Sequence, residues 1–138
     1  MTYLFDASSL ILLIRSSHED RKLAIVNDSR ILDLTIFEVG NALWKESELL
    51  KTLGTEDVEN LVRAVVRALA TLESIALTTE DFAEVLGIAR KEKLTFYASS
   101  YLYVAKKNRL TLVSNDGRLF RVASKYAETE TTQSLLRI

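Results

Sequence analysis

The sequence predicts an α/β fold, a three-layer α/β/α sandwich built around a mostly parallel central sheet. Short apolar runs of strand length alternate along the chain with longer segments of helical periodicity. Such alternation needs right-handed crossovers, which place helices on both faces of a parallel sheet. The length of 138 residues suits one domain with a sizeable core. We therefore expect a single domain over residues 1–138.

The N-terminal apolar runs predict the first strand and the helices that follow it. Residues 2–5 form a short apolar run that ends at Asp6. This pattern is typical of a buried strand that leads into a turn. Ser8 and Ser9 are good N-caps for the apolar helix that comes next. A second helix, with a polar start, is predicted over residues 18–27.

The middle of the chain predicts two strands, at residues 30–34 and 74–77, and two long helices. Thr35 caps the first helix, whose apolar residues recur at helical spacing, and Gly54 ends it. Thr55 opens the second helix, which carries one long apolar face.

The C-terminal third predicts a helix that opens near residue 79, with four apolar side chains facing inward: Phe82, Val85, Leu86 and Ala89. The remaining elements follow in order, and the pattern weakens after them: a helix at 97–108, a strand at 110–113, a turn at 114–117 and a helix at 118–123. On the earlier helix, Ile36, Phe37 and Trp44 are interpreted as core side chains, the alternative being contact with another chain.

Composition excludes several kinds of chemistry. The chain has no cysteine, which excludes a disulfide framework, a thiolate nucleophile and a cysteine zinc site. His18 is the one histidine, and its polar neighbours suit a helix start better than a charge-relay site. Any metal site must therefore use oxygen ligands. A signal peptide and a membrane span are not expected, so we expect a cytoplasmic protein that does not bind membranes.

Charge is unevenly distributed along the chain. Residues 90–125 hold nine basic and two acidic side chains, a formal charge of +7 against −8 for the rest of the chain. This asymmetry suits phosphate attraction beside an acidic site. Solvated helix faces explain it equally well. Tyr97, Tyr101 and Tyr103 lie near these basic residues, where they could stack on bases or pack in the core.

Three acidic residues follow predicted strands or open the next helix. Asp6 ends the first strand, Glu38 lies early in the helix after the second, and Asp116 follows the fourth. Because ligands gather at the carboxyl edge of a parallel sheet, this topology brings all three together. Asn41 shares a helix face with Glu38 and could orient it. Each acid has a local alternative, namely a helix cap, a helix-dipole carboxylate or a turn residue.

Clustered carboxylates favour a divalent cation. Without one they would raise each other's proton affinity, and oxygen-only ligands select Mg²⁺ or Mn²⁺. Such ions activate water and stabilise the leaving oxygen of a phosphodiester without histidine or cysteine. Ser8 and Ser114 adjoin two of the acids and could support bound water or phosphate, or act simply as caps.

Four segments carry a resemblance to a known family. In order and spacing the chain resembles the PIN-domain family, in particular the VapC-type toxins, over nearly its whole length, in residues 4–8, 35–43, 94–102 and 112–119. The resemblance implies Mg²⁺- or Mn²⁺-dependent endoribonuclease activity, homodimerisation and inhibition by a small antitoxin of the VapB type. It also implies that Asp6, Glu38 and Asp116 bind metal, with Asn41 and Ser114 in support.

The third segment departs from the family pattern at one position. The family usually has an aspartate after the aromatic residue, and this chain has Ala98 after Tyr97. Ser99 is a poor replacement, because it points about 100° further round the helix. Three acids suit one Mg²⁺, and a second ion would lack a carboxylate ligand. Two functions therefore stay open: a ribonuclease impaired at Ala98, and an inactive module that binds RNA or an antitoxin. A receiver-like signalling domain is a third, weaker alternative.

Overall fold

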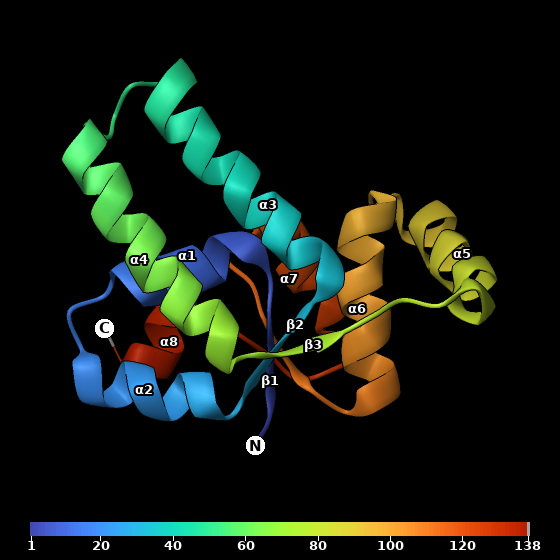
Figure 1. Cartoon of the computed structure of the whole chain (residues 1–138). Coiled ribbons are helices and arrows are strands. Elements are labelled where there is room, and N and C mark those ends of the chain that lie inside the picture. Colours follow the sequence, from blue (N-terminus) through green and yellow to red (C-terminus); the bar gives the residue numbers. More distant parts are fainter. Residues whose placement is uncertain (138) are drawn as a thin grey trace.

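The structure is a computed structural model that describes residues 1–137, and its strands form one parallel five-stranded sheet (Figure 1). The strand order is β3-β2-β1-β4-β5, and every paired strand runs parallel to its neighbour. The strands are β1 (Tyr3–Phe5), β2 (Ser29–Leu32), β3 (Glu73–Ile75), β4 (Thr111–Val113) and β5 (Thr129–Glu130). The predicted α/β class is confirmed.

Helices connect the strands and cover both faces of the sheet. They are α1 (Ala7–Arg15), α2 (Glu19–Asn27), α3 (Asp33–Trp44), a π-helix η1 (Lys45–Leu49), α4 (Thr55–Thr71), a 3₁₀ turn η2 (Thr79–Asp81), α5 (Phe82–Glu92), α6 (Phe96–Asn108), α7 (Gly117–Ala123) and α8 (Thr132–Leu136). Within residues 1–137, none of them combines the length and the apolar character needed to cross a bilayer.

The core consists of two apolar clusters, one on each face of the sheet. Side chains alternate between the faces of a strand, so Phe5 packs among α1, α2, α4 and α8 while its neighbour Leu4 packs against α5, α6 and α7. Val113 and Leu112 divide in the same way on β4. The fold therefore has three layers, with α2, α4 and α8 on one side and α5 and α6 on the other (Figure 1).

The start of α3 differs from the prediction. The helix begins at Asp33, so Thr35 lies inside its first turn instead of capping it. The Thr35 hydroxyl oxygen accepts a hydrogen bond from the Leu32 backbone N–H at 3.1 Å. A side chain that reaches back from the first turn satisfies the same kind of free donor as a cap, so the same residue type is favoured at both positions.

The end of this helix also differs from the prediction. The helical run continues through η1 to Leu49, where Leu50 N donates to the Lys45 carbonyl at 2.9 Å. Lys51 then takes a left-handed conformation, with φ at 52°. Gly54 does not end the helix; it is the N-cap of α4, with φ at −77°.

Five apolar side chains that were assigned to the core are exposed. On α5 the exposed fractions are 55% for Phe82 and 41% for Leu86, while Val85 and Ala89 are buried as predicted. On α3 they are 48% for Ile36, 79% for Phe37 and 51% for Trp44. Both helices thus bury a narrower stripe than their composition indicates, because each packs on the core along one side only.

The last two elements, β5 and α8, have no clear signal in the sequence. β5 is two residues long and lies at the sheet edge, which leaves no apolar run to detect. The chain is tied back by Thr132, whose hydroxyl donates to the Ser9 carbonyl oxygen at 2.9 Å, and by Leu136, which is buried in the core. These contacts are distant in sequence, so no local pattern records them.

A buried carboxylate joins η2 to α6. Asp81 Oδ1 accepts from Tyr103 OH at 2.7 Å and from Lys107 Nζ at 2.9 Å, and Oδ2 accepts from Thr78 N at 3.0 Å. The pKa of the Asp81 carboxyl is held well below its ordinary value. The hydrogen bond from Tyr103 has the largest effect, followed by those from Thr78 and Lys107.

This lowered pKa predicts an acid-dependent stability. A carboxyl whose folded pKa is depressed stabilises the fold above its unfolded pKa, and this contribution is lost as the pH falls through the folded value. Asp81→Asn should therefore lower the melting temperature at neutral pH and flatten its fall below about pH 4. Thermal melts by circular dichroism at several pH values measure this. The same change at exposed Asp28 should leave the profile as in the wild type, and parallel profiles for Asp81→Asn and wild type would contradict the assignment.

Candidate functional site

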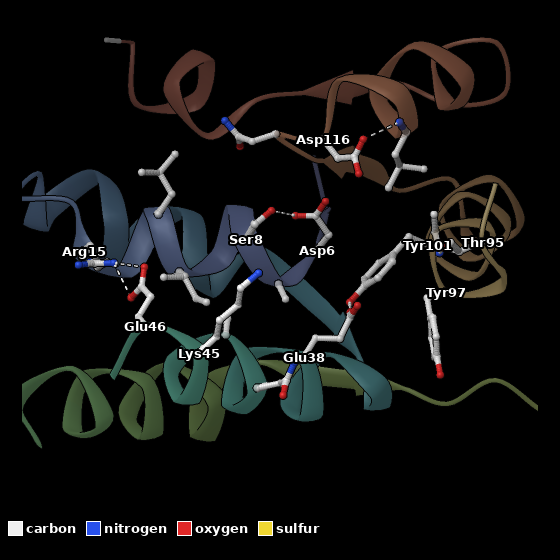
Figure 2. A pocket seen from close by; sticks show the side chains of 18 of the residues that line it. Asp6, Ser8, Arg15, Glu38, Lys45, Glu46, Thr95, Tyr97, Tyr101 and Asp116 are labelled. Atoms are coloured by element: carbon white, nitrogen blue, oxygen red, sulfur yellow. Dashed lines mark hydrogen bonds and ion pairs between the residues drawn. The ribbon is translucent and has the colours of Figure 1, made fainter. Parts of the chain in front are cut away.

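A cleft of about 1030 Å³ opens at the carboxyl edge of the sheet. It lies between α1, the α3–η1 segment, the start of α6 and the loop after β4. The side chains of Asp6, Glu38 and Asp116 point into it from three different elements (Figure 2). The topology thus brings together three acids that are far apart in sequence, as expected for residues that follow parallel strands.

Asp6 caps α1 and also faces the cleft. It is 7% exposed, and its Oδ1 accepts from Ser9 N at 3.0 Å and from Ser8 Oγ at 3.4 Å. The capping residue is therefore Asp6, and the prediction of Ser8 and Ser9 as caps is wrong. The cap fixes the carboxylate at the end of β1, because it ties the side chain to the first turn of the helix.

Glu38 is held by a buried tyrosine. Tyr101 OH donates to Glu38 Oε1 at 2.6 Å and lies 2.7 Å from Thr35 Oγ1. Tyr101 is 2% exposed, and burial, followed by the hydrogen bond to Glu38, raises the pKa of its phenol well above the ordinary value. The phenol therefore stays protonated and donates to the carboxylate, which links α6 to α3 across the cleft.

Asp116 lies in the turn that begins α7. Its Oδ1 accepts from Arg118 N at 3.0 Å and from Leu119 N at 3.1 Å, so it is the N-cap of that helix. Buried Ser114 does not line the cleft; its hydroxyl accepts from the Asp116 backbone N–H at 3.1 Å and fixes the turn.

The three acids share one feature of their hydrogen bonding. Each uses a single carboxylate oxygen for its contacts, and the second oxygen of Asp6, Glu38 and Asp116 has no protein hydrogen-bond partner within residues 1–137. As placed, no three acidic or histidine side chains in that range are close enough to hold one ion. The donor set of carboxylate oxygens in an open cleft nevertheless fits a hard cation such as Mg²⁺ or Mn²⁺, which keeps several waters and needs few protein ligands.

The other predicted site residues lie in or beside this cleft. Ser8, Asn41 and Ala98 all line it. Ala98 is the third residue of α6, and its backbone N–H donates to Thr95 Oγ1 at 3.1 Å. The position where the family pattern has an aspartate therefore faces the cleft with a methyl group only.

Several cleft residues were missed by sequence reasoning. Lys45 lines the cleft two helical turns after Glu38, a spacing of seven residues that could have indicated it. Arg15 and Glu46 form an ion pair at the cleft, with 3.2 Å between Nη1 and Oε2 (Figure 2). That pair joins α1 to η1 across 31 residues, and no local sequence pattern predicts it.

The PIN domain family matches residues 3–125, which is most of the chain. The chain belongs to the PIN-domain family. Among curated proteins, this PIN domain is 37% identical over 129 residues to Exonuclease VapC9 of Pyrobaculum aerophilum, covering 94% of this chain and 91% of that protein. It is 28% identical over 127 residues to Ribonuclease VapC3 of the same organism, covering 86% and 92%.

Solved structures agree with this assignment. The crystal structure of PAE2754 from Pyrobaculum aerophilum is 36% identical to this PIN domain with a TM-score of 0.80, over 99% of this chain and 88% of that one. The structure of FitAB bound to an IR36 DNA fragment is 16% identical with a TM-score of 0.65, over 95% of each chain, which supports the fold alone. The resemblance to VapC-type proteins is therefore confirmed.

Removing the Tyr101 hydroxyl should destabilise this PIN domain. Tyr101→Phe deletes the hydrogen bond to Glu38 and the contact with Thr35 in a buried setting, so a loss of about 1 kcal/mol is expected. Urea unfolding measures it. Tyr97→Phe is the matched control, because the Tyr97 side chain is 62% exposed. Equal stability of the two variants would contradict a structural role for the Tyr101 hydroxyl.

Proposed function

We propose that this chain is a metal-dependent endoribonuclease of the VapC toxin type. The observation that carries the proposal is the convergence of Asp6, Glu38 and Asp116 on one cleft, each with one carboxylate oxygen free of protein partners. The names of its relatives, an exonuclease and a ribonuclease, support nuclease chemistry. Internal cleavage of RNA and the use of Mg²⁺ or Mn²⁺ are the finer parts of the proposal.

Each acid has a defined part in this reaction. Asp6, Glu38 and Asp116 would hold the metal through their free oxygens, while their bonded oxygens keep the side chains in place. When bound, the metal supplies an activated water and stabilises the leaving oxygen of the phosphodiester. Asn41, one turn further along α3, also lines the cleft and would contact a bound ligand, whereas Tyr101 is the residue that orients the Glu38 carboxylate. Ser8 supports Asp6, and Ser114 supports Asp116 through the turn.

Ala98 lowers the expected activity of the site. It replaces a carboxylate that the family pattern provides, so three acids remain to hold metal and a second ion has fewer ligands. Lys45, whose side chain also lines the cleft, offsets part of the negative charge of the three acids. We therefore expect slow cleavage supported by one ion.

The second candidate function is an inactive PIN-fold module that binds RNA or an antitoxin without cutting. The observation that favours it is the same Ala98 methyl group, because loss of one transition-state group commonly costs orders of magnitude in rate. Metal-dependent cleavage distinguishes the two functions, since binding alone leaves the RNA intact.

The proposed partners follow from the family assignment. They are RNA as substrate, an antitoxin of the VapB type as inhibitor, and a second copy of the chain in a homodimer, all in the cytoplasm. The exposed apolar side chains of Ile36, Phe37 and Trp44 are available on α3 for a protein contact. Gel filtration with light scattering of the purified chain measures the dimer.

An end-labelled structured RNA tests the proposed activity. Incubation with the chain and Mn²⁺ should give internal fragments, and chelation by EDTA should abolish them. A ladder that shortens from one end would instead indicate an exonuclease. Cleavage that continues unchanged in EDTA would contradict a metal-dependent site.

A further inference from the structure

A second cleft shares no lining residue with the candidate site. Its volume is about 550 Å³, and it lies between α5, α6 and the segment after α7. The side chains that matter for its chemistry are Lys91, Lys106, Lys107, Tyr103, Tyr126 and Glu84. Three ammonium groups thus face one carboxylate, whereas the first cleft holds four carboxylates against two cations.

Two tyrosine–carboxylate pairs, Tyr126 with Glu92 and Tyr103 with Asp81, form the framework of the second cleft. Tyr126 OH donates to Glu92 Oε1 at 3.0 Å, and Lys106 Nζ lies 5.6 Å from the centre of the Tyr126 ring. On the other side, Lys107 Nζ lies 5.7 Å from the Tyr103 ring. Cation–π contacts of this length hold an ammonium group over a ring. Lys106 and Lys107 are therefore oriented by rings whose hydroxyl groups are themselves hydrogen-bonded.

The charges of the framework are satisfied, and two lysines remain. Lys107 pairs with Asp81 at 2.9 Å, and Lys125 pairs with Glu92 at 2.8 Å. The pKa values of Lys107 and Lys125 are raised, in each case first by the hydrogen bond to the paired carboxylate. Lys91 and Lys106 form no ion pair within residues 1–137, and neither does Glu84, so two unpaired ammonium groups face one unpaired carboxylate in this cleft. The excess positive charge is available to an anion.

The second cleft suits a phosphate backbone better than a base. Tyr103 is 8% exposed, and the Tyr126 ring already has Lys106 and Lys125 over it, so neither ring offers an open stacking surface. Lysine acts on phosphate as a point charge and carries no sequence information. The expected ligand is therefore a phosphodiester chain recognised without regard to sequence.

Helix α6 connects the two clefts. Ala98 in its first turn lines the first cleft, and Lys106, eight residues later, lines the second. At 1.5 Å per residue the separation along the helix axis is about 12 Å, a distance that a strand of a few nucleotides can span. Figure 1 shows α6 between α5 and the rest of the fold.

We propose that the cleft between α5 and α6 is an RNA-backbone site, in which Lys91 and Lys106 bind phosphates of the strand whose scissile bond lies in the acidic cleft. This inference rests on the proposed function, because it takes RNA as the ligand. The basic cleft attracts the polyanion that the four carboxylates of the first cleft repel, and so adds affinity for longer strands.

Fluorescence anisotropy with a labelled single-stranded RNA in EDTA tests the site without cleavage. Lys91→Glu/Lys106→Glu should raise the Kd at least tenfold at about 50 mM salt and lower the salt slope by about 1.4, the value for two phosphate contacts on a single strand. The milder Lys91→Gln/Lys106→Gln should show a smaller loss in the same direction. Arg63→Glu/Arg67→Glu on α4 makes the same charge change on an exposed face and should lose much less affinity for the RNA.

The outcomes separate this inference from the proposed function. Equal losses for the α5–α6 and α4 variants, or no loss for either, would overturn the RNA-backbone site. RNA binding that depends on Lys91 and Lys106 in a chain that does not cleave in Mn²⁺ would support the site and overturn the nuclease. Circular dichroism of each variant confirms that the fold is retained, so that lost binding reports on the lysines.

Discussion

Replacing Ala98 with aspartate should raise Mn²⁺-dependent RNA cleavage by about 10²–10³-fold, the range associated with one transition-state group. The side chain at this position lines the cleft with Asp6, Glu38 and Asp116, so the new carboxylate completes a set of four acids. The fold should tolerate the change, because position 98 is in the first turn of α6, where a negative charge is favourable to the helix dipole. Gel assays of initial rates measure the gain.

A control separates this effect from a change in net charge. Ala83→Asp places the same group on an exposed position of α5, outside the cleft, and should leave the rate as in the wild type. A rate for Ala98→Asp equal to that of the wild type would contradict the view that a lost carboxylate limits the site. Activity in Ala98→Asp alone would support a nuclease disabled at one position.

Replacing Asp6 with asparagine should abolish most of the cleavage, with a loss of about 10²–10³-fold. Asparagine caps a helix as well as aspartate does, so the contact with Ser9 N is kept while the negative charge is removed. The melting temperature should therefore change little. The loss is measured in the wild type or, for a larger signal, in the Ala98→Asp background.

Asp6→Ala is the matched comparison for the cap. It removes both the charge and the cap, so it should lose the same activity and, in addition, about 1 kcal/mol of stability. Undiminished cleavage by Asp6→Asn would show that the Asp6 charge has no part in the reaction. Equal melting temperatures for Asp6→Asn and Asp6→Ala would contradict the capping role.

The sequence predicted the central part of the fold because its strands are short apolar runs between clear helices. Strands near residues 2–5 and 110–113 were placed to within about two residues, as usual for boundaries. The errors have a physical pattern. Lys51 ends a helix in a left-handed conformation that glycine would have signalled, and Phe37 is apolar yet 79% exposed. Neither the left-handed conformation of Lys51 nor the exposure of Phe37 can be predicted from residue propensity or hydropathy.

The candidate site was predictable to the extent that topology determines it. Asp6, Glu38 and Asp116 follow or adjoin parallel strands, and the carboxyl ends of such strands share one edge. The contacts that fix them were not predictable. Tyr101 reaches Glu38 across 63 residues. The sequence indicated only that the Tyr101 side chain packs in the core or stacks on bases. The local alternative for Asp6 is also correct, because its carboxylate caps α1 with one oxygen and leaves the other free. Asp116, whose local alternative was a turn residue, caps α7 in the same way.

Titration with Mn²⁺, followed by the loss of its electron paramagnetic resonance signal, tests most directly whether the three carboxylates form a metal site. We expect saturable binding to the wild type, tighter binding to Ala98→Asp, and loss of binding in Asp6→Asn and in Glu38→Gln. Asp28→Asn, which changes an exposed carboxylate outside the cleft, should bind as the wild type does. Binding that is the same in Asp6→Asn, Glu38→Gln and the wild type would contradict a metal site in this cleft.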